Sequence, residues 1–285
     1  MKKMLISAMI AAMSIVGIAN ADDMLKPIDM AAMSKSKGEV PTYLIGAYED
    51  VPSATAKLKK AGYTIVGTYN VLNSGTTVLF TDTALKTEAA KKNRGFVALL
   101  RLYVDKKDNR ISITNPIYFG KAFMQDDYKQ DVFYNELKTL TTAFSDLKGS
   151  ADQLKFNDLG DYHFMFSMPY YEDFQTVGEG SAGDLFAKAK AYNGGKSFLF
   201  FVKLSENSYI VGYALSKDIS KFPKKIGLQN GLVLPYLILL TDGKAKILSA
   251  KYYLAISYPL LSMGQFMKIS SVPGNIEDYL KKPFK

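Results

Sequence analysis

The side chains that most often carry enzyme chemistry are scarce in this sequence. It contains no cysteine and one histidine, His163. A Ser-His-Asp triad would have to use His163, and one chain can supply neither a thiolate nucleophile nor a cluster of histidine or cysteine ligands for a metal. We therefore predict no metal site and no cofactor. Catalysis by Asp, Glu, Lys or Tyr leaves no characteristic spacing, so an enzyme of that kind stays open.

Arg101 is predicted to lie on an apolar face of a strand. If residues 96–104 are extended, alternation puts Arg101 and Tyr103 on the same face, among apolar side chains. A buried arginine needs a partner, which is either a structural carboxylate between sheet and helix or an anionic ligand in a cleft beside Tyr103. The second half has Leu237 at the equivalent position, so any such site exists once per chain.

His163 is predicted in a strand, 162–168, where a structural or surface role competes with a pH-responsive or ligand-contacting role. The tyrosine pairs Tyr170-Tyr171 and Tyr252-Tyr253 offer a recognition surface if they lie in exposed strands. The candidate ligand-binding residues are Arg101, Tyr103, Asn115, Tyr118 and His163.

A glycine motif precedes a predicted helix in the second half. Residues 178–183 read Gly-Glu-Gly-Ser-Ala-Gly, which fits the G-x-G-x-x-G pattern that binds a pyrophosphate at a helix N-terminus. That function needs a parallel strand running directly into the motif, yet residues 170–176 are polar and acidic. We therefore favour a flexible loop that ends at the helix 184–191.

The N-terminus has the layout of a secretory signal. Lys2 and Lys3 are followed by an apolar run, 4–18, and by small residues at Ala19 and Ala21. The run is shorter than the roughly 20 residues that a spanning helix needs. We expect cleavage after Ala21, a periplasmic location and no transmembrane span after cleavage.

The charge of the chain is basic and carried mostly by lysine. Loss of Lys2 and Lys3 with the signal lowers the formal charge from +9 to +7, and the only arginines are Arg94, Arg101 and Arg110. Nucleic-acid recognition favours arginine forks, so we expect no nucleic-acid partner. Contact with an anionic lipid surface or an acidic protein stays possible.

The elements that must position these residues occur twice in the same order. The first half is predicted to contain a strand, a helix, a hairpin, a helix and two strands, at 42–48, 51–61, 63–69 with 76–80, 83–92, 96–104 and 110–114. The second contains a strand, a helix, a hairpin and two strands, at 162–168, 184–191, 197–204 with 209–214, 232–240 and 246–250. Residues 95–114 align with 231–250 without a gap, which indicates a structural repeat.

Between the halves, residues 132–147 predict an amphipathic helix that packs on the first module or in the groove between modules. Its apolar residues recur at spacings of four and three and so share one face, and they are Phe133, Leu137, Leu140, Phe144 and Leu147.

The repeated strand pairs carry a family resemblance. Leu99-Leu100-Arg101 with Asn115-Pro116, and Leu234-Pro235-Tyr236-Leu237, each keep part of a pattern in which Leu-Pro-x-Arg opens an apolar strand and Asn-Pro follows its partner. The pattern resembles the bacterial and archaeal family called domain of unknown function three-oh-two, over 42–121 and less completely over 161–261. The resemblance implies a two-layer α/β sandwich that can pair into a dimer, here within one chain. It implies no biochemical activity.

The sequence thus predicts an α+β protein of two related two-layer α/β sandwich modules with largely antiparallel sheets. The expected segments are a signal peptide at 1–21, a flexible lead at 22–41, modules at 42–130 and 155–272, a bridging helix at 131–150 and a basic tail at 273–285. Non-catalytic binding of a small molecule or an envelope protein is the favoured function, with a hydrolase or other enzyme and an envelope scaffold as alternatives. The oligomeric state is either a monomer with paired modules or a homodimer.

Overall fold

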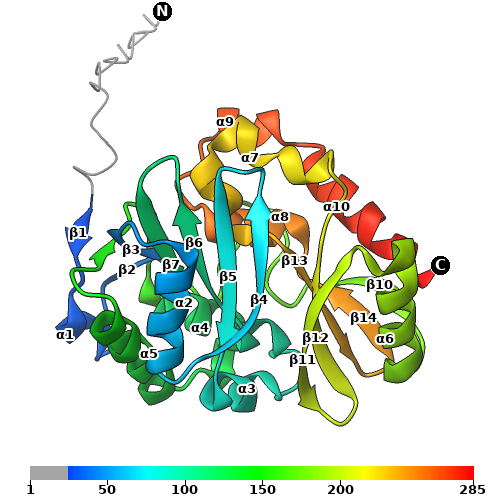
Figure 1. Cartoon of the computed structure of the whole chain (residues 1–285), viewed down its shortest axis with the longest axis horizontal. Helices are drawn as coiled ribbons and strands as arrows, with labels where there is room; N and C mark the ends of the chain where they lie inside the picture. The colour runs from blue at the N-terminus through cyan, green and yellow to red at the C-terminus, as the bar shows by residue number, and fades with distance from the viewer. Residues whose placement is uncertain (1–24) are drawn as a thin grey trace, which may run out of the picture.

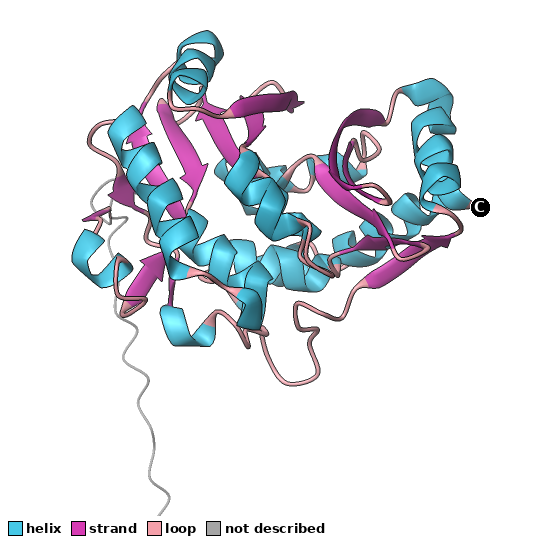
Figure 2. Cartoon of the chain, turned by 90° about the horizontal axis from the view of Figure 1, so that it is seen from below, coloured by secondary structure: helices cyan, strands magenta, loops and turns pink. Residues whose placement is uncertain are grey.

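The computed structural model describes residues 25–285 (Figure 1). The predicted signal peptide, its cleavage after Ala21 and residues 22–24 lie outside the described residues. The predicted α+β class is confirmed, because helices accompany two open sheets in which every strand pairing is antiparallel. Figures 1 and 2 show the two sheets side by side, with helices around and between them.

The first sheet has seven strands in the order β1-β8-β3-β7-β6-β5-β4. Their bounds are β1 Lys26–Pro27, β8 Lys148–Gly149, β3 Tyr43–Ala47, β7 Arg110–Thr114, β6 Leu100–Asp105, β5 Gly75–Thr81 and β4 Thr64–Val71. Short strands β2 (Glu39–Pro41) and β9 (Gln153–Lys155) form a separate pair. Strands β4 and β5 confirm the hairpin predicted at 63–69 with 76–80, and β7 confirms the strand predicted at 110–114.

Local sequence signals explain where the helices of this half begin. Asp50, Asp82 and Asn115 each accept a hydrogen bond from a backbone N–H of the first turn, as helix-capping residues do. The helices are α1 Met30–Met33, α2 Val51–Lys60, α3 Thr83–Ala89, α4 Pro116–Met124 and α5 Gln130–Ala143. Helix α4, which begins at Pro116 directly after its cap Asn115, was not expected from the sequence.

The second sheet has five strands in the order β10-β14-β13-β12-β11. They are β10 Gln175–Glu179, β14 Lys244–Ile247, β13 Tyr236–Thr241, β12 Ser208–Tyr213 and β11 Phe198–Ser205. The helices of this half are α6 Ala182–Ala191, α7 Pro223–Ile226, α8 Ala250–Ser257, α9 Met263–Lys268 and α10 Val272–Lys281. The hairpin predicted around Glu206-Asn207 is confirmed by β11 and β12.

Two predicted strands are wrong in part or in full. The strand predicted at 96–104 begins only at Leu100, because Gly95–Ala98 form a 3-10 helix, η2, packed against the second sheet. A Cβ on Gly95 would lie 2.4 Å from a Leu239 methyl, so a larger residue there would have to displace the Leu239 side chain. Residues 162–168 form loops and turns, in which Phe164 stacks on Phe266 at 5.4 Å and Phe166 is exposed.

Both chain ends are more ordered than predicted. In place of a flexible lead, residues 25–41 contain β1, α1 and β2, and they bury Met33 and Val40. In place of a basic tail, residues 273–285 lie in α10 and a final 3-10 turn, where Ile276 and Leu280 are fully buried. Lys282 and Lys285 are exposed at the end of the segment and Lys281 is half-buried in the last turn of α10, which explains why the charge suggested a tail.

The predicted amphipathic face between the halves is buried. Phe133, Leu137 and Leu140 of α5 have no exposed surface, and Phe144 and Leu147 are also buried although α5 ends at Ala143. A Cβ on Gly120 of α4 would lie 2.5 Å from the Phe133 ring, so α4 and α5 pack closely. The helix therefore packs within the first half.

Tyrosine hydroxyls join the two halves. Tyr118 of α4 donates to the Ile256 carbonyl of α8 at 2.7 Å, and Tyr252 of α8 donates to the Ala122 carbonyl of α4 at 3.4 Å. Tyr43 of β3 donates to the Ser257 carbonyl at 2.8 Å. All three tyrosines are buried, so these bonds replace hydration at the interface.

Candidate functional site

A cleft of about 240 Å³ lies between the first sheet and the second half of the chain. Strands β3 and β7 and the segment after β8 form one wall, and α7, the 3-10 helix η7 (Leu228–Val233) and the α8–α9 region form the other. Polar side chains along its walls include Tyr43, Arg110, Ser112, Asp152, Asn230 and Tyr258.

Arg110 presents free donors to this cleft. It starts β7, opposite Ala47, and Ser112 lies on the same face of the strand and also lines the cleft. The Arg110 Nε is buried and has no hydrogen-bond partner among residues 25–285. The carboxylate that contacts it is Asp108, whose Oδ2 lies 3.6 Å from Nη2, a long ion pair. The Nη1 and Nη2 groups therefore keep most of their hydrogen-bonding capacity for a ligand.

Asp152 supplies a carboxylate to the same cleft. Its Oδ1 accepts the Leu260 N–H at 3.1 Å, which connects the segment after β8 to the α8–α9 loop. Burial raises the pKa of Asp152, and the hydrogen bond from Leu260 opposes that effect. Within the described part of the chain no lysine or arginine nitrogen lies within 4.0 Å of this carboxylate, so Arg110 and Asp152 do not neutralise each other.

The cleft tyrosines are hydrogen-bond donors already in use. Tyr43 donates to Ser257 at 2.8 Å, and Tyr258 donates to the Asn230 carbonyl. Burial raises the pKa of both phenols well above the usual value. They stay neutral and shape the walls rather than act as bases.

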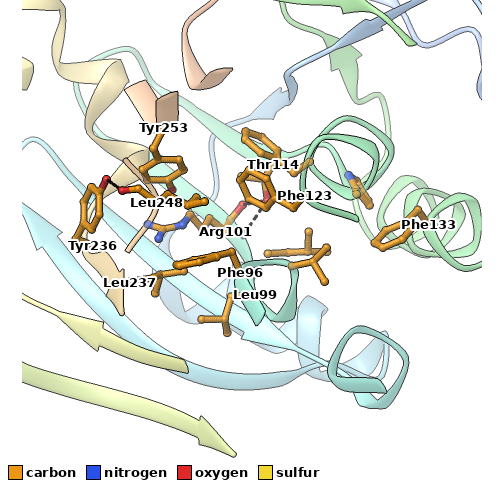
Figure 3. Close-up of a pocket in the computed structure, with 15 residues that line it drawn as sticks. Phe96, Leu99, Arg101, Thr114, Phe123, Phe133, Tyr236, Leu237, Leu248 and Tyr253 are labelled. Atoms are coloured by element: carbon orange, nitrogen blue, oxygen red, sulfur yellow. Dashed lines mark hydrogen bonds between the residues drawn. The ribbon is translucent and has the colours of Figure 1, made fainter. Parts of the chain in front are cut away.

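Arg101 lies elsewhere, in a second cavity of about 30 Å³ (Figure 3). It is 3% exposed and donates to the carbonyls of Leu232 at 3.1 Å and Pro235 at 2.9 Å. No carboxylate among the described residues lies within 4.0 Å of its nitrogens, so the structural ion pair expected as one alternative is not what holds it. Tyr103 is also fully buried, does not line this cavity, and lies 3.2 Å from the Ser74 hydroxyl.

Asn115 and Tyr118 have structural roles. Asn115 is fully buried, caps α4 by accepting the Ile117 N–H at 3.0 Å, and donates to the Pro41 carbonyl at 2.7 Å. The Tyr118 hydroxyl donates its hydrogen bond to the Ile256 carbonyl. Neither has a polar group available for a ligand.

His163 lies in a loop, with its ring 4.4 Å from Tyr170, and it lines neither cavity. The structure therefore does not bring the five predicted residues together. Arg110 and Asp152 were not among the predicted residues. The sequence offered a clue for Arg110, which is one of three arginines and shares a strand face with Ser112. It offered none for Asp152.

The glycine motif has a packing explanation. Gly178 belongs to β10, which pairs antiparallel with β14, and a Cβ there would lie 2.4 Å from Phe284. Ser181 caps α6, and Asp184 in the first turn places a negative charge where a phosphate would bind. Among the tyrosine pairs, Tyr252-Tyr253 is buried in α8 rather than exposed on a strand.

No family model, no curated protein and no solved structure matches this chain. In residues 25–285 no three His, Asp or Glu side chains are grouped so that they could hold a metal ion. Over the same residues, no helix has the length and apolar character needed to cross a bilayer.

Proposed function

We propose that this protein binds a small organic ligand in the cleft between its halves, and that the ligand carries both a carboxylate and an ammonium group, as an amino acid does. The observation that carries the proposal is the pair of Arg110 and Asp152, which line one cleft of about 240 Å³ without forming an ion pair with each other. A ligand with both charges satisfies each of them.

The chemistry of each end is specific. A guanidinium donates two parallel hydrogen bonds to a carboxylate, and the Nη1 and Nη2 donors of Arg110 make no hydrogen bond within residues 25–285 beyond the 3.6 Å ion pair with Asp108. Asp152 accepts from an ammonium, which would also counter the effect of burial on its pKa. Ile45, Leu232 and Leu261 supply apolar wall for an aliphatic side chain.

Binding is favoured over catalysis because the other titratable groups of the cleft are engaged. Tyr43 and Tyr258 donate to carbonyls and hold their protons. One observation favours an enzyme as the second candidate: the raised pKa of Asp152 suits a proton donor or acceptor. Turnover of a bound ligand would select that candidate. The periplasmic location is also a proposal, supported by the signal-like residues 1–21.

We infer that the halves are tandem modules paired about an approximate two-fold axis. The strand orders β3-β7-β6-β5-β4 and β10-β14-β13-β12-β11 correspond element by element. Tyr118 and Tyr252 are each the third residue of a matched helix, and each bonds to the seventh residue of the other. Such reciprocity is the mark of an isologous contact.

The correspondence also refines the sequence alignment. Asp105 pairs with Arg110 across the first turn, whereas Thr241 pairs with Lys244 across the second, so the second turn is two residues shorter. The gap-free alignment of 95–114 with 231–250 thus holds only up to the turn. Pairing within one chain supports a monomer whose cleft lies where the modules meet.

We expect Tyr118→Phe to lower the free energy of unfolding by about 1–2 kcal/mol, since it leaves the buried Ile256 carbonyl without its donor. Tyr252→Phe should have a smaller effect, because its bond to Ala122 is longer at 3.4 Å. Urea denaturation of both variants measures this. Equal stability of Tyr118→Phe and the wild type would argue against the pairing contact.

The ligand proposal is tested with the whole protein purified from its own cells. Native mass spectrometry should detect a bound species of amino-acid mass. In thermal-shift assays, L-amino acids should raise the melting temperature more than the matching carboxylates without the amine or amines without the carboxylate. If all three classes shift it equally, or none does, the proposal is wrong.

A further inference from the structure

Arg101 carries a buried positive charge with little visible compensation. Its neighbours Leu232 and Pro235 contribute only carbonyl dipoles, which use two of the five N–H donors of the guanidinium. The remaining donors have no acceptor within residues 25–285. A buried charge without a counter-charge is strongly destabilising on general grounds.

A second free donor faces the same cavity. Tyr253 of α8 is 7% exposed, lines the cavity with Arg101, and its hydroxyl has no hydrogen-bond partner in the described chain. Burial raises the pKa of Tyr253, and the positive charge of Arg101 opposes the rise, which indicates that the two groups are close. Figure 3 shows the Arg101 guanidinium on the Tyr253 side of the cavity.

The size of the cavity limits what can compensate the charge. A volume of about 30 Å³ holds two or three groups of water size, since one such group needs roughly 10–15 Å³. The other walls are mainly apolar side chains, among them Phe96, Leu99 and Leu237. Multivalent oxyanions are too large, and an organic carboxylate would need more room for its substituent.

We propose that Arg101 and Tyr253 bind a small monovalent anion, chloride being the natural candidate, inside the cavity between the two halves. Arg101 comes from β6 of the first sheet, and Tyr253 comes from α8 of the second half. The anion therefore ties the halves together from inside, apart from the cleft at Arg110. The inference is independent of the ligand proposed for that cleft.

The test compares sodium chloride with sodium gluconate at constant ionic strength. The melting temperature of the wild type should rise with chloride and saturate, by about 3–8 °C overall, because an ion that binds only the folded state stabilises it. Arg101→Met should abolish the difference between the two salts, and Tyr253→Phe should reduce it. Lys106→Met, which removes an exposed charge from the β6–β7 turn, should leave it unchanged.

Chloride NMR on the wild type gives a readout that does not depend on a variant folding. Binding should broaden the chloride resonance, and bromide should reverse the broadening by competition. The proposal is overturned if chloride and gluconate act alike on the wild type, if no broadening occurs, or if Arg101→Met keeps the chloride effect. Each of those results would mean that chloride does not bind at Arg101.

Discussion

Replacing Arg110 by methionine is expected to weaken binding of an amino-acid ligand by about 30- to 150-fold. The variant keeps a flexible chain of similar length but removes every donor that could meet the ligand carboxylate. Hydrogen bonds to a charged group contribute about 1.5–3 kcal/mol, and a bidentate pair lies at the upper end. Isothermal titration calorimetry with the ligand found by thermal shift measures the change in Kd.

Lys106→Met is the matched control, because it deletes one positive charge from the same hairpin while its side chain is exposed and lies outside the cleft. It should bind as the wild type does. Asp152→Asn should weaken the binding of ligands that carry an ammonium group. It should leave the affinity for ligands without the amine unchanged. If Arg110→Met and Lys106→Met lose affinity equally, general charge rather than the cleft attracts the ligand.

The second large effect is a pH dependence of stability that originates at Glu136. This carboxyl lies on α5, is 5% exposed, and accepts the Tyr63 hydroxyl at 2.7 Å. Burial raises its pKa to about 7 from 4.5, the Tyr63 hydrogen bond opposes the rise, and the charge of Asp82 adds to it. The folded state thus holds the proton more tightly than the unfolded state does.

The sign of the effect follows from that difference. Stability from Glu136 is fully present below the unfolded pKa of 4.5 and is lost as pH rises to about 7, by about 3 kcal/mol in all. Glu136→Gln stays neutral and keeps an acceptor for Tyr63. Its free energy of unfolding in urea should match the wild type near the acid end and exceed it above pH 7.

As the pH rises from below 4.5 to above 7, the free energy of unfolding of the wild type must therefore fall more than that of Glu136→Gln. Subtracting one profile from the other removes the contributions of other carboxyls, such as Asp105 and Glu88, whose pKa values are also shifted. Parallel profiles would show that Glu136 ionises in the folded state as freely as in the unfolded chain.

Much of the architecture followed from patterns of short range. Alternation with polar turns predicted the hairpins at β4–β5 and β11–β12, and the spacing of four and three predicted the buried face of α5. These predictions succeeded because strand pairing and helix amphipathicity depend on residues close together in the chain. The same kind of reasoning failed at residues 162–168, where Tyr162 and Phe164 make tertiary contacts and Phe166 is exposed, and none of them lies in a sheet.

The sequence by itself determined which chemistry this protein lacks the side chains for, since it has no cysteine and a single histidine. Only the tertiary structure decided which arginine faces a cleft. Arg101 and Arg110 are both on the β6–β7 hairpin, yet Arg101 donates to the carbonyls of residues 232 and 235, whereas Arg110 lines the cleft that Asp152 also lines. The physical reason is that the carbonyls that bind Arg101 lie more than 130 residues away in the chain, so no local sequence pattern shows that they come close to it.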